Sequence, residues 1–419
     1  MTGGALVVGA SQAGVQLAVS LRRAGYRGPV TLVGAENHPP YQRPPLSKAF
    51  LTGKADATTL HLRTPEFYRE HGIDLVTGER VTHLEVDADG AGRARTAGGR
   101  TLPFDRLALA TGARPRRLEV PGAHLDGVLH LRDLDSATRL RQRLTAGATL
   151  VVVGGGFIGL ETAAVASALG AKVTVVEAAG RAMSRVVAPA VSAFFQEAHA
   201  RRGVEVRLGA AVAEFLGGQG RITGVALADG TVLPAETVVV GIGVVPRTDL
   251  ATDLDLACDG GVLVDACGRT SRPSIVAAGD CVAAPHPTRP GQRIRLESVP
   301  AAIAQARAAG ATLAGQPQPN QEVPWFWSDQ FDLKLQMAGL TDGYDRHVLR
   351  GDPGDERFSV LYYRSGSFVA IHSVNAPADY VAGRAALARG ASIPPEPAAD
   401  PTRSLRSLIT PTAAVPAAQ

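Results

Sequence analysis

Residues 151–161 read VVVGGGFIGLE, and this stretch decides the fold. An apolar run ends there in three glycines, a helical pattern follows over residues 160–169, and a second apolar run, residues 173–176, is closed by Glu177. Strand, glycine-rich turn, helix, strand and terminal acid in this order are typical of a dinucleotide-binding βαβ unit. The alternative is a glycine-rich turn that binds nothing, and the complete set of surrounding parts weighs against it.

Each part of this unit has a physical task. Gly154 permits a tight turn, Gly156 lets the backbone approach a pyrophosphate, and Gly159 lets the helix pack close to the strand. The helix N-terminus offers free N–H groups and a partial positive charge to the phosphates. Glu177 is placed to accept hydrogen bonds from both hydroxyls of an adenosine ribose, and its charge would repel a 2′-phosphate.

The same pattern occurs a second time near the N-terminus. A short apolar strand, residues 5–8, leads into the turn GASQAG at residues 9–14, which is followed by a helical stretch over residues 15–23. The next predicted strand is residues 30–33, and Glu36 follows it. Two dinucleotide sites in one chain suggest two dinucleotides, and the natural pair is a flavin and a nicotinamide between which hydride passes.

Ser11 is a departure in this first turn, because it replaces the middle glycine. Serine is the smallest polar substitute, so a pyrophosphate can still approach, though less freely. Residues 9–13 also loosely resemble the nucleophile elbow of a serine hydrolase. That alternative is weak, since the motif comes very early in the chain and its final glycine is missing.

Composition narrows the class of protein. The 419 residues suggest two to four domains, with 45% hydrophobic and 20% charged residues. No uninterrupted apolar run of about 18 residues predicts a membrane span. The net charge is +4, but no dense basic run with interleaved aromatics is present, so we expect no nucleic-acid partner. The N-terminus enters a strand almost at once without a cleavable leader, and we therefore expect a cytoplasmic protein.

The three cysteines do not form a reactive motif. Cys258, Cys267 and Cys281 show no CxxC or comparable spacing, and the ten histidines are scattered. This pattern argues against a redox-active disulfide, a zinc site or a cluster carried by the chain. Three ordinary thiols and no metal are expected.

A proline-rich loop, PYQRPPLSK at residues 40–48, follows the first βαβ unit. Its prolines forbid a regular helix at the start, and Ser47 is a candidate cap for a short helix beginning at Lys48. A rigid loop of this kind can place the charge of Lys48 at a site. A solvated lysine on a surface loop is an equally good interpretation.

A later strand completes each half of the chain. Residues 105–112, DRLALATG, predict a buried strand that ends in Thr-Gly, and residues 237–243 repeat this plan in TVVVGIG. A further apolar strand, residues 275–278, ends in Gly279 and Asp280. A carboxylate there can bond a ribityl hydroxyl, although a strand-end turn aspartate is the alternative.

The C-terminal region is expected to form a third domain. A helix over residues 296–314, beginning around Val299, either faces a flavin with its N-terminus or simply packs. From residue 324 to 390 the pattern is strand-rich and includes Trp325 and Trp327, which lie on one side of a strand. Core packing is the default interpretation of this pair, and a docking patch is the alternative.

Taken in order, these motifs resemble one family. The motifs are GASQAG, PYQRPPLSK, LALATG, VVVGGGFIGLE, VVVGIGVVP, IVAAGD, ESVPAA and WFWSDQ. They resemble the FAD-dependent NADH:ferredoxin reductases, which have a glutathione-reductase-like fold, and the resemblance covers the chain except its last residues. Two departures are Ser11 and Ala35, which stands where relatives often carry an aspartate.

The resemblance implies an α/β fold with two Rossmann-like domains, one for FAD and one for NAD, and an α+β C-terminal domain. The expected boundaries are 1–113 and 246–322 for the FAD-binding domain, 114–245 for the NAD-binding domain, 323–392 for the C-terminal domain, and 393–419 for a loosely ordered tail rich in proline and alanine.

The implied activity is hydride transfer from NADH to FAD, followed by single-electron transfer to a [2Fe-2S] or related ferredoxin. That ferredoxin would serve a cytochrome P450 or a ring-hydroxylating dioxygenase, and we expect a monomer. Glu177 favours NADH over NADPH, although Arg181 lies near enough to keep NADPH open.

Two related functions are weighed against this one. An NADH oxidase, or another NADH-dependent flavoprotein of the disulfide type, needs a redox cysteine in the first loop, and residues 34–51 contain none. A regulatory NADH-sensing flavoprotein would share both cofactor sites, and only turnover with an acceptor separates it from the enzyme.

The resemblance also implies individual site residues. Lys48 and Glu161 would lie beside the flavin and nicotinamide, without a side-chain nucleophile. The FAD contacts would be Gly9, Ser11, Ala13, Gly14, Glu36, Lys48, Val81, Thr111, Gly112, Arg132, Gly279, Asp280, Val299 and Trp327. The NAD contacts would be Gly154, Gly156, Phe157, Ile158, Gly159, Glu177 and Gly243. Ferredoxin docking would use Arg63, Arg307, Trp325 and Trp327.

Overall fold

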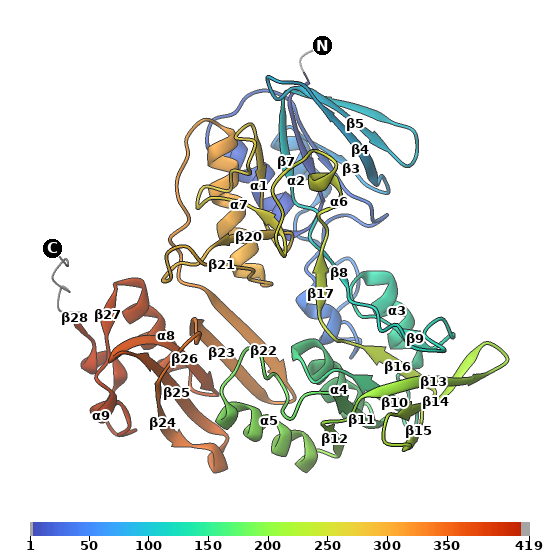
Figure 1. Cartoon of the computed structure of the whole chain (residues 1–419), viewed down its shortest axis with the longest axis vertical. Coiled ribbons are helices and arrows are strands. Elements are labelled where there is room, and N and C mark those ends of the chain that lie inside the picture. The colour runs from blue at the N-terminus through green and yellow to red at the C-terminus, as the bar shows by residue number, and fades with distance from the viewer. Residues whose placement is uncertain (1–2, 412–419) are drawn as a thin grey trace. The chain divides into compact units, whose positions relative to one another are not determined.

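The computed structural model describes residues 3–411, which fall into two compact units (Figure 1). The first unit contains residues 3–43, 56–114 and 244–322, and the second contains residues 44–55, 115–243 and 323–411. The short segment 44–55, which carries Lys48, thus groups with the second unit. No helix among the described residues is long and apolar enough to cross a membrane.

The first unit is built on a parallel sheet in the order β19-β7-β1-β2-β3. It also holds two three-stranded sheets, in the orders β4-β5-β6 and β18-β20-β21. The elements are β1 (Ala5–Val8), α1 (Gln12–Arg23), β2 (Val30–Val33), α2 (Pro65–Glu70), β3 (Ile73–Val76), β4 (Val81–Val86), β5 (Gly92–Thr96), β6 (Thr101–Phe104), β7 (Arg106–Leu109), β8 (Ala113–Pro115), β17 (Val244–Pro246), α6 (Asp249–Thr252), β18 (Val262–Leu263), β19 (Ile275–Ala277), β20 (Val282–Pro285), β21 (Arg293–Ile294) and α7 (Val299–Leu313).

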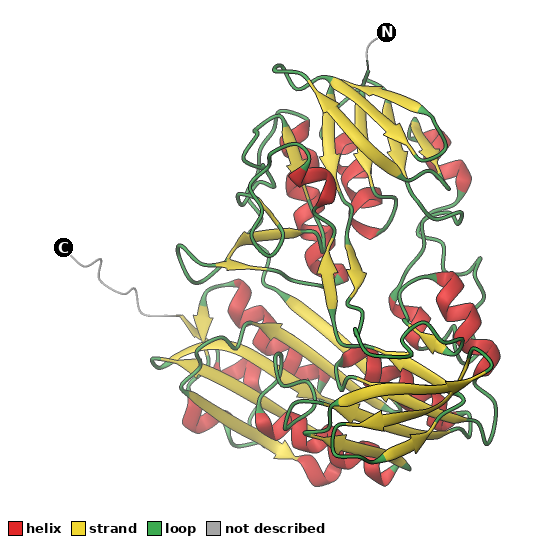
Figure 2. Cartoon of the chain, turned by 45° about the vertical axis from the view of Figure 1, so that its right-hand side comes forward, coloured by secondary structure: helices red, strands yellow, loops and turns green. Residues whose placement is uncertain are grey.

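The second unit contains a parallel sheet in the order β12-β11-β10-β16-β9 and an antiparallel sheet in the order β22-β23-β26-β25-β24 (Figure 2). Its elements are η1 (Pro44–Ser47), β9 (Val128–Leu129), α3 (Leu134–Arg143), β10 (Thr149–Val153), α4 (Phe157–Ala168), β11 (Lys172–Glu177), α5 (Pro189–Arg201), β12 (Val204–Leu208), β13 (Val212–Gly218), β14 (Arg221–Leu227), β15 (Val232–Pro234), β16 (Thr237–Val240), β22 (Trp325–Gln330), β23 (Leu333–Gly339), β24 (Arg346–Asp352), η2 (Pro353–Asp355), β25 (Arg357–Arg364), β26 (Ser367–Val374), α8 (Pro377–Ala388), β27 (Ala391–Ser392), α9 (Pro395–Ala398), η3 (Leu405–Leu408) and β28 (Thr410–Pro411).

The two parallel sheets are copies of one plan, as the repeated motifs predict. In the first, β1 lies between β2 and β7, with Val8 beside Val33 and Leu109. In the second, β10 lies between β11 and β16, with Val153 beside Val176 and Val240. Strands buried on both faces read as continuous apolar runs, which is why β1 and the part of β10 after Thr149 contain only apolar residues.

Helices α1 and α7 pack closely within the first unit. Gly310 on α7 makes this approach feasible, because a Cβ there would lie 2.7 Å from the Cβ of Ser20 and 2.9 Å from the backbone oxygen of Leu17. The alanine-rich sequence of α7 serves the same close packing, since small side chains let helix axes approach.

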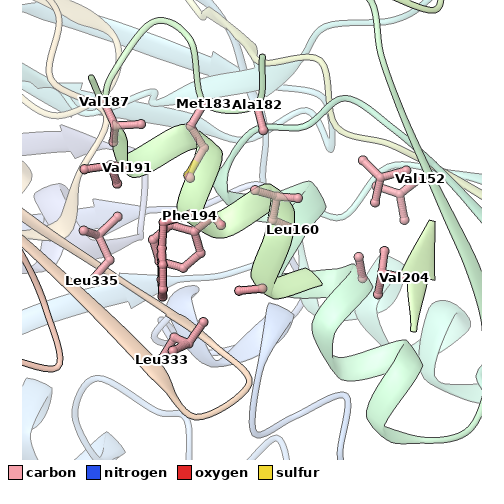
Figure 3. Packing of buried hydrophobic residues seen from close by; sticks show 14 of the residues in the cluster. Val152, Leu160, Ala182, Met183, Val187, Val191, Phe194, Val204, Leu333 and Leu335 are labelled. Atoms are coloured by element: carbon pink, nitrogen blue, oxygen red, sulfur yellow. The ribbon is translucent and has the colours of Figure 1, made fainter. Parts of the chain in front are cut away.

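The antiparallel sheet shares a hydrophobic core with the parallel sheet of the second unit. Phe194 on α5 meets the ring of Phe358 on β25 at 4.9 Å between centroids. Leu333 and Leu335 of β23 lie against the same helix, where Val191 and Phe194 face them (Figure 3). This shared core fixes the C-terminal sheet to the half of the unit that holds the parallel sheet.

The expectation of a loosely ordered tail from residue 393 is wrong for residues 393–411. Ile393, Leu405 and Leu408 are buried in the core beneath α8. Arg350 donates hydrogen bonds to the carbonyls of Ala398 at 3.2 Å and Arg403 at 2.6 Å, which ties the segment down. A composition rich in proline and alanine hides these few anchors, because they follow no helical or strand period. The part of the tail from residue 412 onward lies outside the described residues.

Candidate functional site

The turn after β1 has the geometry that the first glycine motif predicts. Gly9 has φ +115°, and a Cβ on it would clash with the backbone oxygen of Ala110. A Cβ on Gly14 would clash with the backbone oxygen of Gly9. Both glycines are therefore required by the protein's own packing, which brings α1 against the end of β1.

The turn after β10 repeats this geometry in the second unit. Gly154 has φ +107°, and a Cβ on it would lie 2.5 Å from the backbone oxygen of Gly241, in the GIG segment after β16. A Cβ on Gly159 would clash with the backbone oxygen of Gly154. The two turns thus use their first and last glycines in the same way.

The middle position of the second turn differs from these glycines, because it faces open space. A Cβ on Gly156 would meet nothing in the described chain nearer than the Gly241 oxygen at 4.0 Å. The fold therefore does not require glycine here, and a ligand that approaches the backbone supplies the reason for it. Ser11 holds the equivalent position, and its Oγ accepts a hydrogen bond from Arg43 Nε at 3.3 Å.

The N-termini of α1 and α4 are open to an anion. Within residues 3–411, neither helix has a side-chain cap or an acidic residue in its first turn. The first N–H groups of a helix lack intrahelical acceptors, so a pyrophosphate fits both turns. Phe157 and Ile158 begin α4, and Ile158 is exposed.

Glu177 ends β11 and is held in place by the backbone. Its Oε2 accepts a hydrogen bond from the Gly155 N–H at 2.7 Å, and its Oε1 accepts one from the Ala179 N–H at 2.8 Å. The first of these donors lies in the glycine turn itself. The carboxylate is therefore fixed beside the turn with further lone pairs left for ligand hydroxyls.

The acid of the first unit lies two residues further along than Glu177 does. Val33 pairs with the last residue of β1, as Val176 pairs with the last residue of β10, so the two valines are equivalent. Gly34 rather than Glu36 is therefore the equivalent of Glu177. A Cβ on Gly34 would lie 2.6 Å from the Cβ of Ala10, which excludes a side chain there. Glu36 is instead held by Tyr41, whose hydroxyl donates to it, and by Arg43 at 2.5 Å.

Seven further residues predicted to contact FAD lie in the first unit. Gly279 has φ +88° and a backbone N–H that donates to Gln305 Oε1 at 2.9 Å, so it joins the end of β19 to α7. Thr111 Oγ1 donates to the Arg247 carbonyl at 2.7 Å. The other predicted contacts of this unit are Ala13, Val81, Gly112, Asp280 and Val299, with Val299 opening α7 behind the cap Ser298.

The cysteine beside Asp280 is not poised for reaction. Cys281 is buried, and this burial raises the pKa of its thiol. Desolvation also raises the pKa of the Cys258 thiol. A raised pKa keeps sulfur in the less nucleophilic thiol form, which agrees with the expectation of ordinary thiols.

Lys48 and Glu161 come together in the second unit, in a buried cluster of polar side chains around the Glu161 carboxylate. Glu161 on α4 is 2% exposed, and its Oε2 accepts hydrogen bonds from Lys48 Nζ at 2.6 Å and from Ser47 Oγ at 2.5 Å. Its Oε1 accepts a hydrogen bond from Ser328 Oγ on β22 at 2.7 Å. Lys48 is therefore a paired, largely buried cation and not a solvated loop lysine.

Sequence reasoning missed the two serines of this cluster. Ser47 was expected to cap a helix beginning at Lys48, and that expectation is wrong. Ser47 ends the 3-10 helix η1, and its hydroxyl is directed at Glu161. The partners lie 114 and 167 residues apart in the chain, so no local signal revealed them. Tyr41 and Arg43 were also missed. Their partner Glu36 is only 5 and 7 residues away, but the irregular proline-rich loop between them gives no periodic signal.

The predicted docking residues divide into separate local environments. Trp325 and Trp327 stack at 5.6 Å between centroids on β22, and Arg384 lies 4.6 Å from the Trp325 ring centre. Arg307 is exposed on α7 and pairs with Glu322 at 2.8 Å. Arg63 lies over the Phe67 ring at 5.2 Å. Arg132, a predicted FAD contact, lies just before α3 in the second unit and Gly243 just after β16.

Comparison with known proteins places these features in a family. The family model described as pyridine nucleotide-disulphide oxidoreductase matches residues 5–306, and the reductase C-terminal model matches residues 325–409. Rhodocoxin reductase of Rhodococcus erythropolis is 44% identical over 404 residues, which cover 96% of this chain and 94% of that protein. Putidaredoxin reductase of Pseudomonas putida is 39% identical over 409 residues, with 96% of each chain covered.

Solved structures agree with the sequence relatives. The ferredoxin reductase for the CYP199A2 system from Rhodopseudomonas palustris has a TM-score of 0.93 and 42% identity, covering 98% of this chain and 100% of that one. The reductase in a covalent putidaredoxin reductase–putidaredoxin complex has a TM-score of 0.92 and 38% identity, with 97% of each chain covered.

Proposed function

Because the chain belongs to the pyridine nucleotide-disulphide oxidoreductase family, we propose that it is an FAD-dependent NADH:ferredoxin oxidoreductase. Two matched glycine turns, each followed by a helix with an open N-terminus, carry this proposal. They provide one pyrophosphate site for FAD in the first unit and one for NADH in the second. Relatives that align over nearly the whole chain are named as reductases of redox proteins, which supports the same acceptor class.

In this proposal the protein's own residues bind FAD and NADH and orient them. When bound, the nicotinamide supplies hydride and the flavin supplies the conversion of that hydride to single electrons. The N-termini of α1 and α4 would bind the two pyrophosphates, and the carboxylates of Glu36 and Glu177 would accept hydrogen bonds from ribose hydroxyls. Lys48 and Glu161 hold a fixed pair of opposite charges. Lys48, Arg132 and Trp327 lie in the second unit, and their role as FAD contacts stays a prediction.

The preference for NADH over NADPH is supported by two side chains. Glu177 would place its negative charge against a 2′-phosphate. Arg181, the nearby cation, donates to the carbonyls of Val187 at 2.7 Å and Ser184 at 2.6 Å and to Ser192 Oγ at 2.8 Å. Since these contacts occupy its guanidinium, Arg181 is a poor ligand for that phosphate.

The serine hydrolase alternative loses its support at Ser11. A nucleophilic serine needs a general base within hydrogen-bond reach. Ser11 Oγ accepts a hydrogen bond from the guanidinium of Arg43, which is a donor with no acceptor capacity. The disulfide-type alternatives likewise lack a cysteine in the loop after β2.

The identity of the electron acceptor, the oligomeric state and the location in the cell are part of the same proposal. The acceptor is a [2Fe-2S] or related ferredoxin that serves a cytochrome P450 or a dioxygenase, and the enzyme acts as a monomer in the cytoplasm. Three cysteines without a disulfide suit a reducing compartment. Docking through Arg63, Arg307, Trp325 and Trp327 would include the two exposed charges of Arg63 and Arg307, at about 0–1 kcal/mol each, so ferredoxin reduction should weaken with salt.

An absorbance spectrum followed by anaerobic titration with NADH tests the proposal. We expect a flavin spectrum that NADH bleaches, and then reduction of cytochrome c that depends on an added [2Fe-2S] ferredoxin. A protein that cannot be reconstituted with FAD would refute the proposal. Bleaching by NADH without transfer to any ferredoxin, at low or high salt, would favour the NADH-sensing alternative.

A further inference from the structure

A line of buried polar side chains continues from Glu161 into the C-terminal sheet. Ser328 Oγ, which binds Glu161, also lies 3.1 Å from Gln330 Nε2, and Gln330 Oε1 lies 2.8 Å from His199 Nε2 on α5. Glu161 is 2% exposed, and Ser328, Gln330 and His199 are each 0% exposed. Four buried polar groups in series are costly unless every partner is matched, so their order calls for a reason.

The direction of every hydrogen bond in this line follows from simple donor counting. An ionised Glu161 can only accept hydrogen bonds, so Ser328 must donate its single hydroxyl hydrogen to it. Ser328 then accepts from the Gln330 amide NH₂, which leaves the amide oxygen facing His199. His199 must therefore carry its proton on Nε2. All donors in the line point toward the carboxylate.

His199 is held in this neutral form by its surroundings. Burial is the main cause that lowers its pKa to about 4, and the positive charge of Arg202 acts in the same direction. The hydrogen bond that His199 donates to Gln330 opposes both effects. Arg202 itself pairs with Glu356 at 2.7 Å and Asp332 at 2.8 Å. Among the described residues, His199 Nδ1 has no hydrogen-bond partner, so a second proton there would find no acceptor.

We propose that His199 and Gln330 are positioning residues that hold the Ser328 hydroxyl on Glu161, so that the carboxylate keeps Oε2 for Lys48. The His199 proton sets the orientation of the Gln330 amide. Without it the amide can turn over, and Ser328 can then donate to the amide oxygen instead of to Glu161. This inference rests on the proposed function only in assigning Lys48 and Glu161 to the reaction with NADH.

Double-mutant cycles with Glu161→Gln test this inference. His199→Phe removes the donor, Gln330→Met removes the amide at similar volume, and His199→Gln restores a donor. The rate constant of FAD bleaching by NADH is measured anaerobically by stopped flow. We expect each donor-removing variant to lower it about 3- to 10-fold, the value of one hydrogen bond, with the NADH concentration at half-saturation unchanged. His199→Gln should recover part of the loss.

The cycle separates positioning from general stability. In the Glu161→Gln background the same substitutions should change the rate constant less than about 2-fold, because they act through Glu161. His372→Phe is the control, since His372 is buried in the same sheet but bonds Tyr362 at 3.0 Å. It should lower stability without changing the rate constant. Equal losses with and without Glu161 would overturn the inference, as would unchanged rates in His199→Phe and Gln330→Met.

A second readout keeps the inference separate from the proposed function. Urea unfolding of the FAD-free variants gives the same cycle without any nucleotide. We expect the combined change in the unfolding equilibrium constant of His199→Phe and Glu161→Gln to be several-fold smaller than the product of the single changes. A combined change equal to the product of the single changes would overturn the inference even where NADH bleaches the flavin. Failure of NADH to bleach the wild-type flavin would refute the function and leave this cycle intact.

Discussion

Replacement of Lys48 by methionine isolates the energetics of the buried carboxylate. Methionine keeps most of the side-chain volume but removes the charge that lies 2.6 Å from Glu161 Oε2. Removal of one partner from a buried ion pair costs about 3–5 kcal/mol, because the remaining charge is left uncompensated. Here Ser47 and Ser328 still donate to the carboxylate, and Lys48 is 20% exposed, so the lower end, about 3 kcal/mol, is expected.

The chain carries its own probe for this measurement. Its two tryptophans, Trp325 and Trp327, both lie on β22, whose residue Ser328 binds Glu161. Tryptophan fluorescence during urea unfolding of the FAD-free protein therefore reports on the second unit. The free energy of unfolding of Lys48→Met should fall by about 3 kcal/mol, and the further substitution Glu161→Gln should recover at least half of the loss.

Two outcomes would contradict this reasoning. A loss below about 1 kcal/mol in Lys48→Met would mean that the pair behaves like an exposed salt bridge. A double variant that is less stable than Lys48→Met by the full cost of Glu161→Gln would mean that the two charges do not compensate each other. Lys54→Met, on the exposed part of the same loop, is the matched control and should change stability by less than about 0.5 kcal/mol.

Three further predictions concern the second turn, its acid and a surface ion pair. Gly156→Ala should leave thermal stability within about 0.5 kcal/mol of wild type but weaken NADH binding at least several-fold by titration, whereas Gly159→Ala should destabilise the protein by more than about 2 kcal/mol because its Cβ meets a backbone oxygen. Glu177→Ala should raise kcat/KM for NADPH relative to NADH about 10-fold or more, and an unchanged ratio of the two would contradict the assignment of its carboxylate to the ribose. The hydrogen bond to Arg202 lowers the pKa of Glu356 to about 2, so its stabilisation is complete above the unfolded value of 4.5 and is lost as the pH falls toward 2. Because Glu356 is partly exposed, Glu356→Gln should cost about 1–2 kcal/mol at pH 7 and almost nothing near pH 2, as urea unfolding at both pH values will show.

The glycine turns illustrate what local sequence can predict. Tight turns with φ near +110° require glycine at Gly9 and Gly154, and close packing of each helix on its own strand requires glycine at Gly14 and Gly159. Both βαβ units can therefore be predicted from the sequence alone. Buried parallel strands are continuous apolar runs, which made their repeat readable. The family resemblance rests on these local patterns and on their order along the chain.

The C-terminal segment and the first acid show where local patterns fail. Residues 393–411 look like a tail because proline and alanine dominate, yet a few buried side chains and the guanidinium of Arg350 anchor them. Glu36 takes the place of an acid at position 34 because Ala10 fills the space there. In both cases the deciding contact comes from a residue that is distant in sequence or hidden by composition.

The sequence by itself determined the two dinucleotide-binding units, because turns, helices and buried strands are specified by neighbouring residues. Only the tertiary structure decided which side chains join Glu161 in one line of hydrogen bonds, since Ser47, Lys48, Ser328, Gln330 and His199 come from η1 and its following residue, β22 and α5. A buried charge takes its partners from whatever elements the core packing brings beside it, and hydrogen bonds of this kind leave no periodic trace in the chain.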